Sequence, residues 1–236
     1  FRKLREMGAY AIEPVLEEKK AKLPDVQDVV DEVVNVLSPK DMQGMKVLVT
    51  AGPTYEPIDP VRIITNRSSG KMGIAIAREA KRRGAEVTLV CGPTDVRIPR
   101  GIKTFWVETT QQLFDAVVSE LKSSTYDVVV AAAAAADYTP EKAFGYKVPT
   151  REHPSLEIKL TSTPKVIDAV KEVSPSSFLI AFRAEYGVSD EELIQSAIKR
   201  MKAANADMIV VNDVGRPNVG FRYDTNEVFV IDKDEN

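Results

Sequence analysis

The sequence predicts an α/β protein in which a mostly parallel central sheet is covered by helices on both faces. Two observations lead to this prediction. From residue 45 onward, short apolar segments rich in β-branched residues alternate with segments whose apolar residues recur at helical spacing. Such alternation is typical of the three-layer, Rossmann-like arrangement of parallel strands and crossover helices. In these sheets ligands bind beyond the carboxyl ends of the strands, so the functional site is expected there.

The predicted elements follow one another along the chain. Strands are expected at residues 46–50, 86–91, 103–107, 127–133, 156–160, 178–182, 207–211 and 227–231, and helices at residues 70–83, 110–121, 164–173 and 189–204. We expect hydroxyl side chains to cap the first two helices, Ser68 or Ser69 for one and Thr109 or Thr110 for the other. Gly84 is expected to end the first helix.

The first part of the chain, residues 1–43, differs from the main domain at residues 44–236. Residues 7–14 are strand-like, and residues 25–37 carry valine and leucine at helical spacing. Two interpretations are open: an N-terminal arm packed on the main body, or the tail of a second domain that has been cut away. The chain starts with Phe1 instead of Met, which favours a fragment or a processed product.

Composition excludes several classes of function. The 236 residues include 32 basic and 35 acidic side chains, a formal net charge of −3, which gives no broad electrostatic case for binding nucleic acid or an anionic membrane. No apolar run approaches the ~18 residues of a membrane span, and no signal segment opens the chain. The single Cys91 excludes an intrachain disulfide and fits a reducing cytoplasm, and we expect a core residue there instead of a reactive thiol. The single His153 argues against a Ser-His-Asp triad and a multi-histidine metal centre, and is expected at the surface.

A polar, glycine-containing turn at residues 64–73 leads directly into the first predicted helix of the main domain. Unpaired backbone N–H groups and a positive dipole end make such a helix start suited to phosphate. The turn is not a Walker A loop, because Gly70 and Lys71 are followed by Met72, and it lacks the G-x-G-x-x-G pattern of dinucleotide folds. Local chemistry leaves two alternatives: an anion site, or a capped helix entry without a ligand.

Polar or small residues also follow several predicted strands. After Val128-Val129-Val130 a run of six alanines leads into Asp137, and we favour small side chains that let a flat ligand lie against exposed backbone groups. Asp137 suits a ribose hydroxyl or a phosphate-bound Mg²⁺, and turn capping is its structural alternative. Two other strand ends carry Arg183 and Asn212. Lys147 lies on a predicted loop, from which a lysine can clamp anionic oxygens.

Taken in order, these motifs resemble phosphopantothenoylcysteine synthetase of the bacterial and archaeal type. The resemblance covers roughly residues 44–232 and is carried by Ala51-Gly52-Pro53-Thr54, Asp59-Pro60-Val61-Arg62, Asn66 through Gly73, Ala136-Asp137-Tyr138, Lys147 and Asn212-Asp213-Val214. That family is the second domain of a bifunctional coenzyme A biosynthetic protein. The resemblance implies that residues 1–43 are the end of its first domain, a decarboxylase that binds FMN, and that the enzyme is cytoplasmic.

The resemblance implies a two-step ligation of 4′-phosphopantothenate and cysteine. In the first step the carboxylate attacks the α-phosphate of CTP, with Mg²⁺ as cofactor, and gives an acyl-cytidylate and pyrophosphate. In the second step the amine of cysteine attacks the acyl carbon and CMP leaves. Lys147 matches the family lysine of the first step, Asn66 matches the asparagine that holds the acyl carbonyl in the second, and Arg62 is a candidate for the phosphopantothenate end.

The same matching implies a nucleotide site and a dimer. The residues expected around CTP are Ser68, Gly70, Gly73, Ala131, Ala132, Ala133, Asp137, Lys147, Thr163, Pro164, Lys165, Val166, Phe182, Arg200 and Asn212, with Asp137 also the expected metal ligand. The chain departs from many bacterial relatives at Pro149-Thr150 and at Ala204, where they carry lysines, and Arg200 is expected to take part of that role. Family members are homodimers with a flap that crosses between subunits, which residues 53–66 are expected to form. CTP, and not ATP, is inferred from the bacterial and archaeal character of the match.

Two other functions compete with the ligase. A nicotinamide-dependent oxidoreductase would use the same sheet pattern, but Gly52-Pro53-Thr54 follows the first strand of the main domain where that class carries G-x-G-x-x-G. A non-catalytic nucleotide-binding module would bind CTP without turnover. Pyrophosphate release in the presence of the two other substrates separates both from a ligase.

Overall fold

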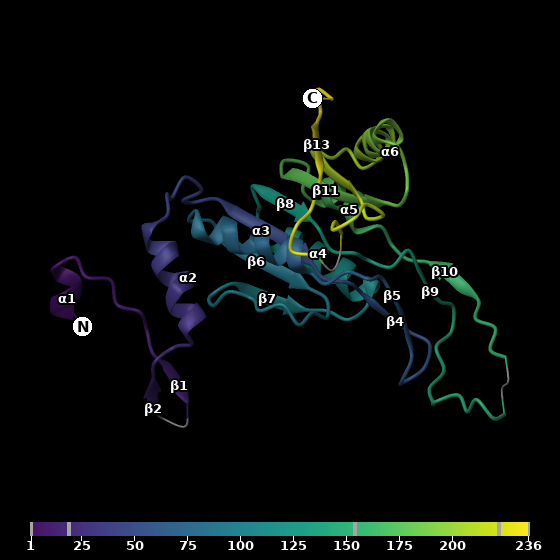
Figure 1. The fold of residues 1–236 in the computed structure, drawn as a ribbon, viewed down its shortest axis with the longest axis horizontal. Coiled ribbons are helices and arrows are strands. Elements are labelled where there is room, and N and C mark those ends of the chain that lie inside the picture. Colours follow the sequence, from purple (N-terminus) through teal and green to yellow (C-terminus); the bar gives the residue numbers. More distant parts are fainter. Residues whose placement is uncertain (1, 18–19, 153–154, 221–222, 236) are drawn as a thin grey trace.

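A seven-stranded sheet forms the centre of the computed structural model, which describes residues 2–17, 20–152, 155–220 and 223–235 (Figure 1). Phe1 and His153 lie outside the described residues. The strands follow the order β13-β12-β11-β8-β3-β6-β7, and their bounds are β3 Lys46–Ala51, β6 Glu86–Cys91, β7 Lys103–Trp106, β8 Val128–Ala131, β11 Phe178–Glu185, β12 Met208–Asp213 and β13 Phe229–Asp232. Neighbouring strands are parallel except at the β12–β13 edge, which is antiparallel. The predicted α/β class with a mostly parallel sheet is confirmed.

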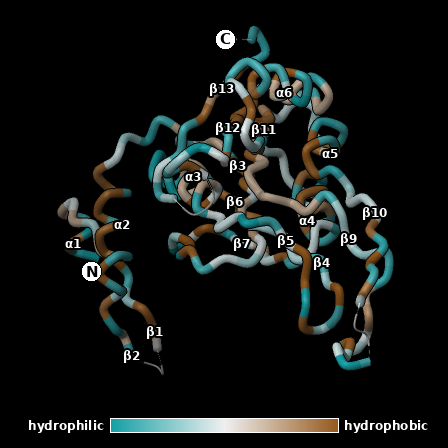
Figure 2. Tube along the Cα trace, turned by 45° about the vertical axis from the view of Figure 1, so that its right-hand side comes forward, coloured by the Kyte–Doolittle hydropathy of each residue, from teal (hydrophilic) through white to brown (hydrophobic). Residues whose placement is uncertain are grey.

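Helices cover both faces of the sheet. Helix α3 (Lys71–Arg82) packs on β3 and β6, while α4 (Thr110–Ser123), α5 (Val166–Val173) and α6 (Asp190–Ala203) lie on the opposite face (Figures 1 and 2). Each layer has its own apolar core. Large buried side chains between α3 and the sheet include Ile74, Val49 and Leu89, and those between the sheet and the other three helices include Leu48, Leu113, Leu193 and Ile209.

The helix ends explain why these segments start and stop where they do. Thr109 is the N-cap of α4 and Ser189 is the N-cap of α6. Each forms a reciprocal capping box with the residue three positions later, Gln112 and Glu192 respectively. Helix α3 differs from the prediction, because neither Ser68 nor Ser69 is its N-cap. Gly70 occupies that position with φ 81° and caps without a side chain. Gly84 follows the last turn with φ +96°, as predicted.

The strand predicted at residues 156–160 is wrong in its position. The structure has only a short strand there, β10 (Leu160–Ser162), which pairs with β9 (Tyr138–Pro140) outside the central sheet. Strand β9 lies next to β4 (Tyr55–Pro57), which forms a hairpin with β5 (Ile63–Thr65) from the polar excursion at residues 53–66. Most of residues 155–162 are exposed, and they have no neighbour in the main sheet to extend the pairing.

The N-terminal segments lie to one side of the sheet (Figures 1 and 2). They comprise α1 (Arg2–Glu6), the hairpin β1 (Val15–Glu17) and β2 (Lys20–Lys22), and the amphipathic helix α2 (Val26–Leu37). The strand predicted at residues 7–14 is wrong, because no other strand pairs with it among the described residues. Helix α2 has no buried residue and meets the body mainly at α3. None of the described helices has the length and apolar character needed to cross a membrane.

Candidate functional site

A pocket of about 1190 Å³ opens at the carboxyl ends of β3, β8, β11 and β12. Each strand contributes a residue at or near its end: Thr50, Ala131, Phe182 and Asn212. The chain runs from β3 to one side of the sheet through β6 and β7, and then returns to β8 on the other side. The pocket therefore lies at the point where the strand order reverses, the usual ligand site of open α/β sheets.

The turn before α3 forms one wall of this pocket and is held by close backbone packing. Gly70 lies so near to Gly52 that a Cβ atom there would be 3.3 Å from the Gly52 backbone. The Thr94 hydroxyl donates a 2.7 Å hydrogen bond to the carbonyl of Ser69, which fixes the other side of the turn. Because no acidic residue lies in the first turn of α3, its N-terminal N–H groups and dipole favour an anion in the pocket.

The alanine run forms the floor of the pocket as extended backbone. Two hydroxyls hold it, one from the end of β3 and one from the segment that follows: Thr50 accepts from the Ala133 N–H at 3.1 Å, and Thr54 accepts from the Ala136 N–H at 2.9 Å. The Ala134 N–H donates to the Gly52 carbonyl at 2.9 Å. Small side chains therefore line the pocket above a strand end whose N–H groups at Ala133, Ala134 and Ala136 are bonded within the protein.

Asn66 joins the turn to the alanine run. Its side-chain nitrogen donates to the carbonyl oxygens of Ala134 at 3.1 Å and Ala135 at 3.0 Å. Both neighbours are acceptors, so the nitrogen of the amide must face them. The amide oxygen is consequently the polar atom of Asn66 that remains to meet a ligand.

Several cationic side chains that line the pocket are paired with carboxylates. Lys165 donates to the carboxylate of Asp137, and Arg200 donates to Asp168 at 2.7 Å. Lys71, in the first turn of α3, bonds to Asp224 at 2.7 Å across the pocket. A ligand that binds these cations would have to replace the ion pairs, which are weak because several of the side chains are exposed.

Most residues predicted for the site, the catalytic candidate Asn66 and the nucleotide-binding candidates, line this one pocket. They are Asn66, Ser68, Gly70, Gly73, Ala131, Ala132, Ala133, Asp137, Thr163, Pro164, Lys165, Val166, Phe182, Arg200 and Asn212. Arg62 and Lys147 are not part of its lining. Arg62 lies in the β4–β5 hairpin, where Asp59 and the segment of residues 144–148 surround it.

Three groups near the site were given no role from the sequence. Glu56 is buried and accepts from the Thr110 N–H at 2.8 Å, which ties the hairpin base to the start of α4. Thr54 also bonds to Thr110 through their hydroxyls at 2.8 Å. Tyr223 lines the pocket from the loop after β12. Of the three, only Thr54 belongs to a motif singled out in the sequence, Ala51-Gly52-Pro53-Thr54. The motif did not indicate that its hydroxyl would bond to Thr110 and Ala136.

Among the described residues, Asp137 is the candidate metal ligand at the main pocket. The described residues contain no cluster of three or more His, Cys, Asp or Glu side chains suited to a metal ion. Mg²⁺ often takes one or two protein carboxylates and draws its other ligands from water and phosphate. Asp137 at the pocket rim fits that limited demand.

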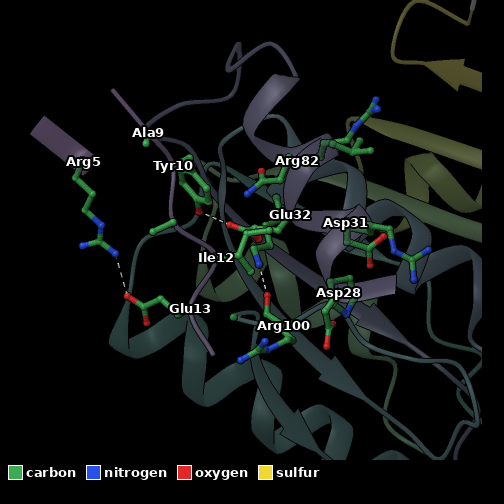
Figure 3. Close-up of a pocket in the computed structure, with 17 residues that line it drawn as sticks. Arg5, Ala9, Tyr10, Ile12, Glu13, Asp28, Asp31, Glu32, Arg82 and Arg100 are labelled. Carbon is green, nitrogen blue, oxygen red and sulfur yellow. Dashed lines mark hydrogen bonds and ion pairs between the residues drawn. The ribbon is translucent and has the colours of Figure 1, made fainter. Parts of the chain in front are cut away.

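A second cavity, of about 630 Å³, lies between the N-terminal segments, α2 and α3 (Figure 3). Two contacts join side chains that line it: Arg5 pairs with Glu13 at 3.3 Å, and the Tyr10 hydroxyl bonds to Glu32 (Figure 3). The bond to Glu32 raises the pKa of Tyr10.

Other side chains that line this second cavity bind residues outside it, as Asp28 does with Arg97 and Arg82 with Glu79. The buried Nε of Arg82 has no hydrogen-bond partner among the described residues. We attribute the cavity to imperfect packing of the N-terminal segments on the body.

The fold and the main pocket define an α/β protein with its ligand site at the switch point of a doubly wound sheet. Residues 42–236 match the family described as DNA/pantothenate metabolism flavoprotein C-terminal domain, and the chain belongs to this family. The resemblance predicted from the motifs is therefore confirmed at the level of the family.

Individual relatives agree with this membership. The chain is 44% identical over 233 residues to the coenzyme A biosynthesis bifunctional protein CoaBC of Thermococcus kodakarensis, which covers 98% of this chain and 56% of that protein. The CoaBC protein of Bacillus subtilis is 37% identical over 194 residues, 82% of this chain and 46% of its own length. A crystal structure of a CoaBC C-terminal domain is 39% identical with a TM-score of 0.66, covering 82% of this chain and 84% of that one. The chain thus spans about half the length of these curated relatives.

Proposed function

We propose that this chain is a phosphopantothenate–cysteine ligase, which joins 4′-phosphopantothenate and cysteine in coenzyme A biosynthesis with CTP as the activating nucleotide. One observation carries the proposal: the N-terminus of α3, Asn66 and the alanine backbone meet in one pocket. An anion site beside a group that can accept an amine hydrogen suits an enzyme that activates a carboxylate and then forms an amide. The names of the CoaBC relatives support the same pathway.

In the first step, a carboxylate oxygen of phosphopantothenate forms a bond to the α-phosphorus of CTP and the bond to pyrophosphate breaks. Negative charge then gathers on the phosphate oxygens. The N–H groups at the start of α3, near Ser68, Gly70 and Gly73, are suited to hold it. Lys147 would neutralise further charge, and Arg62 would bind the phosphopantothenate end. Bound Mg²⁺ would supply charge neutralisation on the triphosphate, with Asp137 as its protein ligand or as a partner of the ribose.

In the second step, the amine of cysteine bonds to the acyl carbon and the bond to CMP breaks. Asn66 was expected to hold the acyl carbonyl, but its nitrogen is occupied by Ala134 and Ala135. We therefore assign its amide oxygen the task of accepting an N–H of the attacking amine. This contact would direct the lone pair of the nitrogen toward the acyl carbon, and holding the amine in that geometry would raise the rate of attack.

The cytidine would lie over the alanine backbone. Ala131, Ala132 and Ala133 leave room for a flat base, and the half-buried ring of Phe182 offers an apolar surface beside it. Thr163, Pro164, Lys165, Val166, Arg200 and Asn212 would complete the nucleotide site. The backbone can read the cytosine edge without a dedicated side chain.

The assembly is part of the same proposal. A homodimer would let the β4–β5 hairpin reach a partner's pocket, and the exposed Phe178 and Val230, on one face of the sheet, suit a contact between copies. Residues 1–43 would be the tail of an FMN-dependent decarboxylase domain. The family match starts at residue 42, whereas the Thermococcus protein aligns with 98% of the chain. The single buried Cys91 suits the cytoplasm.

Pyrophosphate release tests the proposal directly. The purified chain is incubated with phosphopantothenate, Mg²⁺ and CTP, ATP, GTP or UTP in turn, with and without cysteine. We expect release with CTP above the other nucleotides, and CMP only after cysteine is added. Binding of CTP without turnover would favour a non-catalytic module. Enhanced NADH fluorescence without pyrophosphate release would favour an oxidoreductase.

A further inference from the structure

Asp59 is a buried carboxylate that the reaction described above does not use. Its side chain is 0% exposed, although it lies near the tip of the β4–β5 hairpin. One carboxylate oxygen accepts from the N–H groups of Val61 and Arg62, both at 2.8 Å. The other accepts from the guanidinium of Arg62, whose Nε lies 2.9 Å away, and from the Val148 N–H at 3.2 Å. The carboxylate thus serves donors from two segments that are far apart in the sequence.

The contact of these two segments extends beyond Asp59. Arg62 donates to the carbonyl of Val148 at 2.8 Å, and the Phe144 N–H donates to the carbonyl of Ile58 at 2.8 Å. The side chain of Val148 is itself buried. Figure 1 shows the hairpin and the loop between β9 and β10 extending together from the same end of the sheet. Each segment would therefore move with the other.

Lys147 immediately precedes Val148, so the hydrogen bonds between Val148 and the Asp59–Arg62 pair also act on the backbone of Lys147. We call these bonds the tie between the hairpin and the loop. Both the N–H and the carbonyl of Val148 are bonded to the Asp59–Arg62 pair, so the backbone that carries Lys147 is fixed from the hairpin. The Arg62 guanidinium and three backbone N–H groups hold the pKa of Asp59 well below its usual range, which keeps the carboxylate charged at neutral pH. Neither Lys147 nor Arg62 lines the pocket in this arrangement.

We propose that Asp59 is a positioning residue for the first step, which ties Lys147 and Arg62 into one unit so that both cations reach the reacting anions together. The inference rests on the proposed function. The carboxylate touches neither nucleotide nor substrate in this scheme and acts through Lys147. The side chain of Lys147 is long and exposed, so its position depends on how firmly the backbone at residue 147 is held.

Asp59→Asn tests the tie, because asparagine keeps the shape but places an N–H₂ group against other donors. Asp41→Asn is the matched control: Asp41 also accepts two bonds from one arginine, Arg83, but both side chains are partly exposed and lie at the α2–α3 junction. We expect Asp59→Asn to slow pyrophosphate release by about 10²-fold, the usual effect of a misplaced reacting group, and Asp41→Asn to leave it unchanged.

A double-mutant cycle separates positioning from general damage. If Asp59 acts through Lys147 and Arg62, adding Asp59→Asn to Lys147→Gln should slow the rate by much less than the loss of about 10²-fold in the wild-type background, because residues of one unit are not additive and only the share of Arg62 is left to lose. Losses that multiply would overturn the inference, as would a wild-type rate in Asp59→Asn. Should Asp59→Asn unfold at the assay temperature, Asp59→Glu, which keeps the charge but lengthens the side chain, supplies the same comparison.

Limited trypsin digestion provides a readout that does not depend on ligase activity. Cleavage after Lys147 should be faster in Asp59→Asn than in wild type or Asp41→Asn, at conditions where circular dichroism shows all three folded. Unchanged cleavage would overturn the inference even if the ligase reaction is confirmed. Faster cleavage without any pyrophosphate release by the wild type would leave the tie supported and reject the proposed function.

Discussion

The side-chain nitrogen of Asn66 lies 3.0 Å from the carbonyl oxygen of Ala135, and this contact joins the turn before α3 to the alanine run after β8. Two walls of the main pocket are thereby held at a fixed separation. The same contact decides which polar atom of Asn66 can meet a ligand. Because the nitrogen is used within the protein, the oxygen is the atom that faces substrate in the proposed reaction.

Asn66→Asp should separate the two steps of the reaction. The new carboxylate would place an oxygen where the amide nitrogen now donates to two carbonyl oxygens, so the side chain must turn away from them. We expect pyrophosphate release to continue and transfer to cysteine to fall, so that acyl-cytidylate accumulates. Quenched-flow chromatography of CMP and acyl-cytidylate measures this. Asn205→Asp, at the end of α6 with φ 48°, is the control, because aspartate tolerates that backbone. Unimpaired amide formation by Asn66→Asp would remove the assigned role.

Lys147→Gln should suppress the first step. A preorganised cation that meets developing phosphate charge typically contributes about 10²–10³-fold to the rate, and we expect a loss of that size in pyrophosphate release. Binding of CTP, measured by calorimetry, should change much less. Lys142→Gln, in the same exposed loop, is the matched control. A rate near that of the wild type in Lys147→Gln would show that this lysine does not act in the first step.

The sequence predicted the middle of the central sheet well because strands such as β3 and β6 are buried on both sides. Segments such as residues 46–51 and 86–91 carry their structural signal in their own composition. The strand predicted at residues 156–160 failed for the opposite reason. Its pairing depends on β9, a partner that local sequence does not reveal, and the whole ribbon lies outside the main sheet.

The candidate site divides in a similar way. Pocket residues such as Ser68, Asp137 and Asn212 follow from their place after strands or before a helix, and the topology brings those ends together. Contacts that depend on side-chain direction were out of reach. Nothing in the sequence shows that Glu56 bonds to Thr110, or that Asp59 reaches the Val148 N–H, because these pairs join segments more than fifty residues apart. The N-cap of α3 was predicted wrongly because the sequence does not show the left-handed conformation of Gly70. That conformation accompanies close packing of Gly70 against Gly52 and Thr94, which lie elsewhere in the chain.

Gly73→Ala should destabilise the domain through helix α3. A Cβ atom on Gly73 would lie 2.7 Å from the Cβ of Ala51 and 2.8 Å from the carbonyl oxygen of Thr50, so the helix must move off β3. Overpacking of this kind typically costs about 1–3 kcal/mol in the free energy of unfolding. Gly145→Ala is the control, because a Cβ atom there meets nothing within 4 Å. Urea unfolding measures both variants, and equal midpoints for Gly73→Ala and wild type would contradict the close approach.

Cys91 should be unreactive while the protein is folded and should make stability depend on alkaline pH. Burial raises the pKa of this thiol from 9.0 to about 11. The reactive thiolate is therefore scarce in the folded protein at pH 8, and a thiol reagent should label Cys91 only after urea is added. In the unfolded chain the thiol ionises near its ordinary pKa, so the unfolded state loses its proton first as the pH rises. The contribution of Cys91 to stability is then complete below pH 9 and is lost as the pH rises toward 11.

The size of this loss can be measured against a variant without the thiol. Between pH 8 and pH 10 the free energy of unfolding of the wild type should fall by about 1 kcal/mol more than that of Cys91→Ala. The comparison removes other groups that ionise in this range, since both proteins keep them. Tyr126 is one such group, because its hydroxyl begins to ionise near pH 10 in the unfolded chain, whereas burial raises its pKa to about 12 in the folded protein. Parallel pH dependence of the two proteins, or fast labelling of the folded wild type, would show that Cys91 reaches solvent and would contradict its place in the core beneath α3.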